Sequence, residues 1–281
     1  MQILKSIDAC TQWRNSKKIT IGFVPTMGAL HDGHLSLVRL SKKVCKETVV
    51  SIFLNPKQFT KNEDLDSYPI TIKDDLKKLE QENVDVVFIP DANEIYKNNQ
   101  DNYWFDTPLA SKLEGKSRPH FFKGVTMVVH KLFQIVQPSH AVFGQKDAQQ
   151  LLIIKQMIKH NNYGIKMIAG STVRSEGGLA LSSRNQYLNT KETKIAHNIY
   201  LGLLKIKSCL DSGEKDSTIL KNTFIAHINQ FGELSIDYIS IACRESLDEI
   251  VGPINQNALI STAVFLNKVR LIDNFSYSPS T

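Results

Sequence analysis

Short apolar runs alternate with amphipathic segments through residues 1–170. Five runs of apolar and β-branched residues predict strands that are covered on both faces: 19–24, 49–54, 84–89, 141–144 and 165–169. Four segments with apolar residues at helical spacing predict helices between them: 35–46, 72–81, 125–136 and 148–159. This alternation predicts right-handed crossovers and a Rossmann-like α/β fold with a doubly wound parallel sheet. Ligands bind such sheets at the carboxyl ends of the strands, so the segments that follow the strands are the places to look for chemistry.

The pattern changes after Arg184. A helix is predicted over 191–208, and the polar stretch 211–216 follows it. Three further apolar runs, 236–242, 260–265 and 269–272, predict strands. The sequence therefore predicts a second, smaller α+β domain, with the larger domain at 1–175 and the smaller one at 176–281.

Composition narrows the class of protein. The 281 residues are 42% hydrophobic and 22% charged, which is ordinary for a globular chain. No apolar run reaches the roughly 20 residues that span a bilayer, and the N-terminus lacks the apolar stretch of a secretory signal. The four cysteines are far apart and form no C-x-x-C pair, which favours reduced thiols in a cytosolic protein over a zinc site or disulfides.

The formal net charge of +6 fits three kinds of protein. The lysines are scattered along helical segments, as on an ordinary solvated surface. A few of the cations could instead line a pocket for anionic substrates. RNA binding is the third possibility, but the chain has neither an RNP-type aromatic motif nor a dense basic stripe.

The segment 25–34, PTMGALHDGH, lies where the first predicted strand ends and the next helix begins. A helix N-terminus attracts phosphate, and Gly28 and Gly33 let the backbone approach a ligand closely. His31 and His34 share one face of the first turn, where an imidazole can donate to a phosphate oxygen. Two alternatives are a metal site, for which no third ligand has a convincing spacing, and purely structural histidines.

Two more segments follow predicted strands. In 55–59, NPKQF, the amides of Asn55 and Gln58 suit a substrate with hydroxyl groups and a carboxylate, or are ordinary turn residues. In 143–150, FGQKDAQQ, Lys146 can neutralise a phosphate, and Asp147 can cap the next helix or bind a Mg²⁺-bound water. Gln150 lies one turn further on. A lysine beside an aspartate is also common on surfaces.

The segment 177–185, GGLALSSRN, has two hydroxyls and an arginine after a double glycine. Ser182, Ser183 and Arg184 could clamp a triphosphate, because the guanidinium offers a planar fork of donors. A serine-rich linker between domains is the alternative. Its place at the domain boundary suits both, since a hinge allows a lid to close.

Together these segments and the terminal 270–274, RLIDN, resemble the pantoate–β-alanine ligases (pantothenate synthetases) along nearly the whole chain. The H-x-G-H element by itself indicates only the wider nucleotidyltransferase superfamily. Three positions depart from the family pattern. Gln145 stands where the family usually has glutamate, Lys57 where it is often apolar, and Phe121 where it has histidine, because His120 comes one place early.

The resemblance implies an enzyme that condenses pantoate with β-alanine through a pantoyl-adenylate, releasing AMP and pyrophosphate. It implies that His34 is the catalytic residue. It also implies a homodimer in the cytoplasm whose substrates are small molecules, with no binding to nucleic acid or membranes. Residues 1–175 would bind nucleotide and pantoate, 176–281 would act as a lid, and Mg²⁺ would enter with ATP without an assigned protein ligand. The implied ATP-binding residues are Met27, Gly28, Ala29, Leu30, His31, Asp32, Gly33, His34, Gly144, Gln145, Lys146, Asp147, Val173, Leu181, Ser182, Ser183 and Arg184. The implied substrate-binding residues are Asn55, Gln58 and Gln150. An alternative within enzymes is an adenylyltransferase that stops after the first step.

Overall fold

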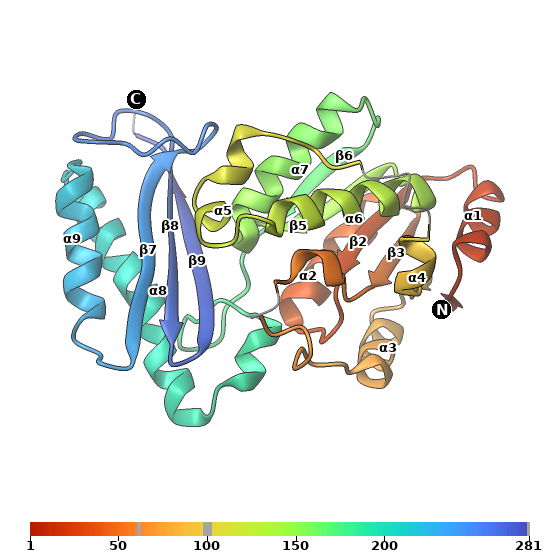
Figure 1. The fold of residues 1–281 in the computed structure, drawn as a ribbon, viewed down its shortest axis with the longest axis horizontal. Helices are drawn as coiled ribbons and strands as arrows, with labels where there is room; N and C mark the ends of the chain where they lie inside the picture. Colours follow the sequence, from red (N-terminus) through yellow and green to blue (C-terminus); the bar gives the residue numbers. More distant parts are fainter. Residues whose placement is uncertain (61–62, 98–102, 280–281) are drawn as a thin grey trace. The chain divides into compact units, whose positions relative to one another are not determined.

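The structure is a computed structural model that describes residues 1–60, 63–97 and 103–279. The chain packs into two compact units (Figure 1). The first contains residues 1–110, 118–145 and 149–171, and the second contains 111–117, 146–148 and 172–281. The second unit is therefore discontinuous, because two short segments from the first half of the chain pack with its C-terminal part.

A parallel sheet forms the centre of the first unit. Within the described residues it has six strands: β1 (Gln2–Leu4), β2 (Ile21–Thr26), β3 (Glu47–Ile52), β4 (Val86–Phe88), β5 (His140–Gly144) and β6 (Lys166–Gly170). Their order is β1-β4-β3-β2-β5-β6, and every neighbouring pair is parallel. The predicted Rossmann-like doubly wound sheet is confirmed. The short edge strand β1 was not predicted.

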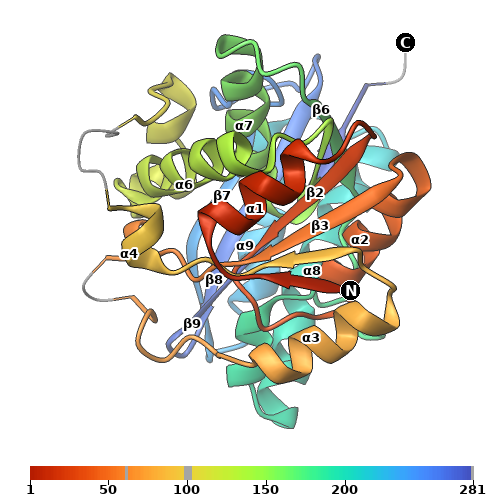
Figure 2. The same ribbon diagram turned by 90° about the vertical axis from the view of Figure 1, so that its right-hand side faces the viewer.

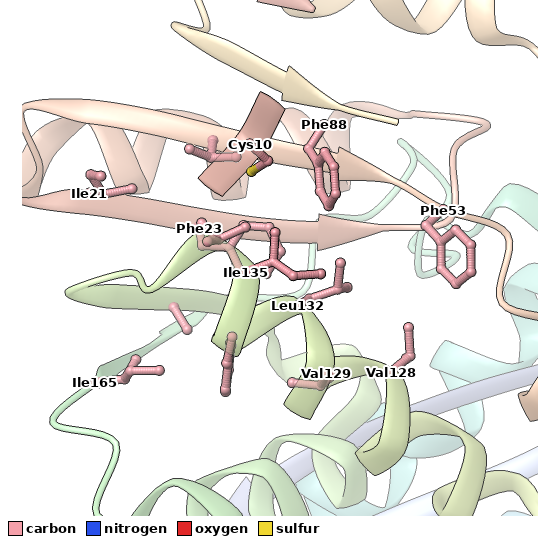
Figure 3. Packing of buried hydrophobic residues seen from close by; sticks show 14 of the residues in the cluster. Cys10, Ile21, Phe23, Phe53, Phe88, Val128, Val129, Leu132, Ile135 and Ile165 are labelled. Carbon is pink, nitrogen blue, oxygen red and sulfur yellow. The ribbon is translucent and has the colours of Figure 1, made fainter. Parts of the chain in front are cut away.

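Helices cover both faces of this sheet, as Figure 2 shows. Residues such as Phe23 and Phe88 point to one face, where they pack against α1 (Ile7–Asn15), α6 (Phe121–Val136) and α7 (Ala148–His160) (Figure 3). Their neighbours Val24 and Val87 point to the other face, against α2 (Asp32–Val44) and α3 (Ile72–Gln81). Burial on both faces explains why these strands read as continuous apolar runs.

The strand order reverses at β2. From β2 the chain continues to β3 on one side, whereas β5 and β6 lie on the other side. The loops after β2, β3 and β5 leave the same edge of the sheet, because parallel strands point the same way. This is the topological switch point where doubly wound sheets bind ligands, and it is where the candidate residues of the first unit lie.

An antiparallel sheet and two helices make the core of the second unit. The strands β7 (Leu234–Cys243), β8 (Ala258–Leu266) and β9 (Val269–Tyr277) pair in that order. The helices α8 (Thr190–Asp211) and α9 (Ser217–Ile228) share a hydrophobic core with them. The α+β prediction is confirmed, with α9 as an unpredicted addition.

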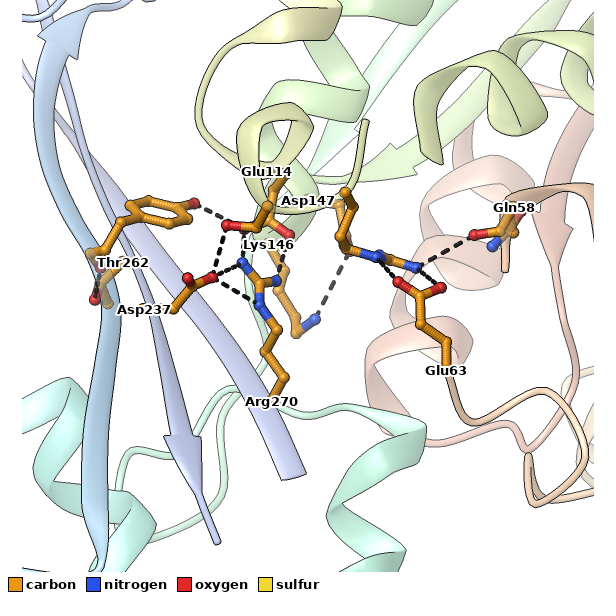
Figure 4. A network of polar contacts seen from close by, with 11 residues as sticks. Gln58, Glu63, Glu114, Lys146, Asp147, Asp237, Thr262 and Arg270 are labelled. Carbon is orange, nitrogen blue, oxygen red and sulfur yellow. Dashed lines mark hydrogen bonds and ion pairs between the residues drawn. The ribbon is translucent and has the colours of Figure 1, made fainter. Parts of the chain in front are cut away.

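The remaining α-helices of the described residues are short, α4 (Ala92–Ile95) in the first unit and α5 (Glu114–Ser117) in the second, and 3₁₀ helices lie at Pro56–Gln58, Pro108–Ser111, Gln145–Asp147 and Ser183–Tyr187. Arg270 on β9 holds α5 through Glu114, with Nη1 and Nη2 at 2.5 and 3.1 Å from the two carboxylate oxygens, and it also pairs with Asp237 at 2.6 Å (Figure 4). Burial alone would lower the pKa of Arg270, but the hydrogen bonds and charge of Glu114 outweigh it and raise that pKa. Arg270 therefore stays positively charged and links α5 to the sheet through ion pairs. Among the described helices, none is long and apolar enough to span a membrane.

Candidate active site

The loop between β2 and α2 is held by other parts of the first unit. Gly28 and Ala29 both have positive φ, 86° and 49°, a region that glycine enters without steric cost. The amide of Gly28 donates to Thr26 Oγ1 at 3.3 Å. The next two amides, of Ala29 and Leu30, donate to the two oxygens of Asp75 at 2.9 and 2.8 Å. These three amides are therefore bound within the protein, and the side chains of Ala29 and Leu30 are buried.

The two histidines at the start of α2 have a defined tautomer. Nδ1 of His31 accepts the amide of Gly33 at 3.1 Å, and Nδ1 of His34 accepts the amide of His31 at 3.4 Å. A nitrogen that accepts an N–H carries no proton, so the neutral ring has its proton on Nε2. The rings lie 4.1 Å apart between centroids. In the neutral state each half-buried imidazole therefore carries its ring proton on Nε2.

Asn55 and Gln58 follow β3 and are linked to each other and to the β2 loop. The side chain of Asn55 is 1% exposed, and its Nδ2 donates to Gln58 Oε1 and to the carbonyl of Gly124, both at 3.1 Å. Its Oδ1 accepts the amide of Lys57 and the hydroxyl of Tyr96. These contacts use the full donor and acceptor capacity of the Asn55 amide. Asn55 therefore orients the side chain of Gln58 through its hydrogen bond to Oε1.

Gln58 points its amide nitrogen at the β2 loop. Its Nε2 donates to Met27 Sδ at 2.9 Å, which leaves that nitrogen a second proton for another acceptor. The backbone carbonyl of Gln58 accepts from Arg118 at 3.3 Å, and Arg118 also pairs with Glu63 at 2.5 Å (Figure 4). Two predicted residues from separate segments, Met27 and Gln58, are thus brought into contact in the first unit.

The end of β5 carries the remaining predicted residues of the first unit. Gly144 is half-buried at the carboxyl end of the strand, and Gln145 is exposed. Gln150 is half-buried on the first turn of α7, while its neighbour Gln149 is buried and donates to the carbonyl of Leu109 at 2.7 Å. Gln149 thus has a structural partner.

Lys146 and Asp147 belong to the second unit, although only Gln145 separates them from the end of β5 in the first unit. The backbone carbonyl of Lys146 accepts from Asn274 Nδ2 on β9 at 2.7 Å. Its ammonium lies 3.9 Å from the carboxylate of Asp147, and the lysine side chain is largely buried. The terminal strand therefore fixes the backbone of the predicted phosphate-binding lysine.

The predicted clamp begins with a hairpin. The amide of Leu181 donates to the carbonyl of Val173 at 2.9 Å, and a tight turn at 175–178 connects the two arms. Gly177 and Gly178 allow this turn to approach α8, because an added Cβ would come within 1.9 Å of the His197 ring or 2.3 Å of the Tyr200 ring. The double glycine is therefore a packing requirement.

A buried ion pair stabilises this hairpin. Arg174 donates to both oxygens of Asp273 on β9, at 2.5 and 2.9 Å, and to the carbonyl of Gly178 at 3.0 Å. Beyond the hairpin, Ser182 Oγ caps the 3₁₀ helix 183–187 by accepting the amide of Arg184 at 3.3 Å, and Ser183 is buried. Arg184 itself is half-buried.

The comparisons with known proteins agree over the full length. The sequence model for the family described as pantoate-beta-alanine ligase matches residues 2–276. The chain belongs to this family. The pantothenate synthetase of Pseudothermotoga lettingae is 44% identical over 278 residues, 98% of each chain, and that of Thermosipho africanus is 48% identical over 92% of each.

Solved structures agree with the family assignment. The crystal structure of the Thermus thermophilus pantothenate synthetase has a TM-score of 0.93 at 34% identity, and the match covers 99% of this chain and 100% of that one. The Francisella tularensis pantoate-beta-alanine ligase, described as complexed with beta-gamma ATP and beta-alanine, has a TM-score of 0.80 at 37% identity over 98% and 97%.

The departures of this ligase from the family pattern lie at accessible positions. Gln145 and Lys57 are exposed, and the Lys57 ammonium lies 5.7 Å from the centre of the Tyr96 ring. His120 is exposed just before α6. Phe121, in the place of the expected histidine, stacks on the Arg118 guanidinium at 3.8 Å.

Sequence reasoning missed the residues that hold the candidate segments of each unit in place: Asp75 and Tyr96 in the first unit, and Arg174 and Asp273 in the second. Asp75 left a usable signal, because it lies four residues before the buried Leu79 and so places a charge on the apolar face of a helix. Burial raises the pKa of Tyr96, which keeps its hydroxyl protonated as a donor to Asn55. Among the described residues, no group of three His, Cys, Asp or Glu side chains could hold a metal ion.

Proposed function

We propose that this chain makes pantothenate from pantoate, β-alanine and ATP in two steps. A pantoate carboxylate oxygen first attacks the α-phosphorus of ATP, and pyrophosphate leaves. The β-alanine amine then attacks the acyl carbon of pantoyl adenylate, loses a proton, and AMP leaves. A carboxylate is a poor acyl donor, so adenylation supplies the leaving group. Family membership over residues 2–276 is the observation that carries this proposal.

His34 is the catalytic residue in this proposal. Its Nε2–H, fixed by the Nδ1 contact with the backbone, would donate to phosphate oxygens as charge builds up on the departing pyrophosphate. His31 offers a second donor of the same kind. Phosphoryl and nucleotidyl transfer depend mainly on positioning and charge stabilisation, which fixed imidazole donors supply.

The proposed ATP-binding residues belong to both units. The loop 27–34, with Gly144 and Gln145, would contact the nucleotide from the first unit. Lys146 and Asp147, Val173 at the adenine, and 181–184 over the phosphates would do so from the second. Mg²⁺ would arrive with ATP and be held mainly by phosphate oxygens and water.

The substrate side is built on amides. Gln58 and Gln150 would bind the hydroxyls and carboxylate of pantoate, and Gln58 would also lie near β-alanine. Asn55 supports this by fixing the Gln58 carbonyl oxygen at 3.1 Å. We also propose that residues 1–175 act as the nucleotide- and pantoate-binding domain, that 176–281 act as a lid, and that the enzyme works as a homodimer in the cytoplasm.

A coupled assay for AMP tests the proposal. Purified protein is given ATP, Mg²⁺, pantoate and β-alanine, and each component is omitted in turn. AMP release should require all four. A stable adenylated product that accumulates whether or not the amine is present would indicate the adenylyltransferase alternative, and AMP release without pantoate would refute the ligase.

His34→Ala tests the catalytic assignment. Losing one transition-state donor typically lowers the rate by about 10²–10³, or about 2.7–4 kcal/mol. Pyrophosphate release in a single turnover should slow by that factor, while thermal unfolding changes little because the ring is only half-buried. Near-normal turnover would remove His34 from the mechanism.

A further inference from the structure

Asp75 on α3 is a fully buried acidic residue directed at the β2 loop. Its side chain is 0% exposed, and each carboxylate oxygen accepts one loop amide, Oδ2 from Ala29 at 2.9 Å and Oδ1 from Leu30 at 2.8 Å. The hydroxyl of Thr71 adds a contact to Oδ1 at 3.2 Å. A buried carboxylate needs hydrogen-bond donors, and Asp75 has these loop donors only while the loop keeps this conformation.

The conformation of that loop also fits the carboxylate. Successive backbone amides that point toward a common position can bind an anion there, and the amides of Ala29 and Leu30 both point at the Asp75 carboxylate. A Cβ on Gly28 would lie 3.2 Å from Asp75 Oδ2 and 3.2 Å from Ile52, at a φ of +86°. Here the protein's own carboxylate occupies the position that an external anion takes in other such loops.

Lys78, one turn further along α3, binds the other backbone polar group of Leu30. Its ammonium donates to the carbonyl of Leu30 at 2.6 Å. The Leu30 amide is bound by Asp75 and the Leu30 carbonyl by Lys78, so both polar groups of this residue are fixed by one helix. The next residue is His31, whose ring caps α2 and whose backbone amide orients the His34 ring.

We propose that Asp75 and Lys78 are positioning residues that set the orientation of His31 and His34 without touching the substrate. The inference rests on the proposed function, because it assigns those imidazoles to adenylation. Asp75 acts as a built-in anion that fixes the loop before ATP arrives. The loop amides of Ala29 and Leu30 donate hydrogen bonds to this internal carboxylate. In the proposed mechanism the imidazole Nε2–H groups face the nucleotide.

Asp75→Asn is the main test. The amide has nearly the same shape, but its NH₂ group would face one backbone N–H, so two donors would meet. Asp74→Asn is the matched control, since it makes the same charge change on the same helix turn at an exposed position. A misplacement of catalytic groups by about 1 Å can lower the rate on the order of 10²-fold. We expect a loss of kcat of that order in Asp75→Asn and near-normal kcat in Asp74→Asn.

A second readout separates positioning from general stability. The ring carbon-bound protons of His31 and His34 are followed by NMR in each variant without nucleotide. Asp75→Asn should shift both ring signals, and Asp74→Asn should leave them in place. Lys78→Met, with exposed Lys77→Met as its control, removes the ammonium but keeps the length of the side chain. It should shift the same two signals even if Asp75→Asn fails to fold.

The outcomes distinguish the inference from the proposed function. Unmoved histidine signals in both Asp75→Asn and Lys78→Met, or kcat equal to that of their controls, would overturn the positioning role. A wild-type protein that forms no AMP under the full assay would instead overturn the proposed function. In that case the NMR comparison still decides whether Asp75 and Lys78 orient the two rings.

Discussion

Gly124→Ala tests how closely α6 must approach the segment 55–58, which follows β3 and contains the proposed pantoate-binding Gln58. A Cβ at position 124 would lie 2.2 Å from the carbonyl oxygen of Lys57, 2.5 Å from its carbon and 2.7 Å from the amide nitrogen of Gln58. All three atoms are backbone, so no flexible side chain can swing away. Helix and loop would have to separate by roughly 1–2 Å to reach ordinary contact. The carbonyl of Gly124 also binds Asn55, so this shift disturbs the Asn55–Gln58 pair as well.

Two effects of opposite sign determine the stability change. Alanine favours the helix over glycine by about 1 kcal/mol. Overpacking usually costs about 1–3 kcal/mol, and the contact with backbone atoms places this case at the upper end. A net loss of about 1–2 kcal/mol lowers Tm by roughly 2–8 °C for a unit of this size. A displacement of Gln58 by about 1 Å should also reduce kcat/KM for pantoate on the order of 10²-fold.

Calorimetry and the pantoate dependence of AMP formation measure both effects. Gly232→Ala is the control, because a Cβ there has no atom within 4 Å. If Gly124→Ala melts at or above the wild-type temperature with an unchanged KM for pantoate, the close approach of α6 does not position Gln58, and the reasoning from the contact distances is wrong.

Two further predictions concern the second unit. Asp273→Asn leaves Arg174 without its carboxylate partner. Breaking a buried ion pair costs about 3–5 kcal/mol of folding free energy, and the partial exposure of Arg174 favours the lower end. The urea concentration at the unfolding midpoint should therefore fall clearly. Burial, and next the charge of Lys205, lower the pKa of His227, so the unfolded chain binds this proton more tightly. Stability should therefore fall as pH drops below about 6.5, and His227→Gln should flatten that dependence in urea titrations.

The sequence predicts the first unit well because its strands are buried on both faces. Apolar runs such as 19–24 and 49–54 have few alternatives to a covered parallel strand, and the observed β2 and β3 lie within two residues of them. The edge strand β1 gives no such signal, since it has three residues and Ile3 is exposed. The sequence pattern predicts no element over residues 217–228, and α9 begins there, directly after the polar stretch 211–216.

The assignment of the site residues stays a prediction, and the sequence indicates residues that follow strands more readily than the residues that hold their segments in place. His31, His34 and Gln58 follow apolar strands directly, so the parallel topology alone brings them to one edge. Asp75 reaches the loop across 45 residues of sequence from Leu30, and Asp273 reaches Arg174 across 99. Local patterns do not identify the partners in such pairs. The place of Asp75 on the apolar face of a helix marks it as unusual, but nothing near it in sequence points to the loop that it binds.

The ion pairs of Arg270 limit where the chain can be cut into fragments that fold separately. Glu114 and Lys146 pack with the C-terminal part of the chain although they come long before Thr172 in sequence. A fragment expressed from Thr172 onward would keep Asp237 but leave Arg270 without its two-oxygen contact to Glu114, and Asn274 without the carbonyl it binds. Such a fragment would carry a desolvated guanidinium that is only partly neutralised. The C-terminal part is therefore no transferable module, and gene fusions or chimeras joined at this point would have to carry the segments around Glu114 and Lys146 with it.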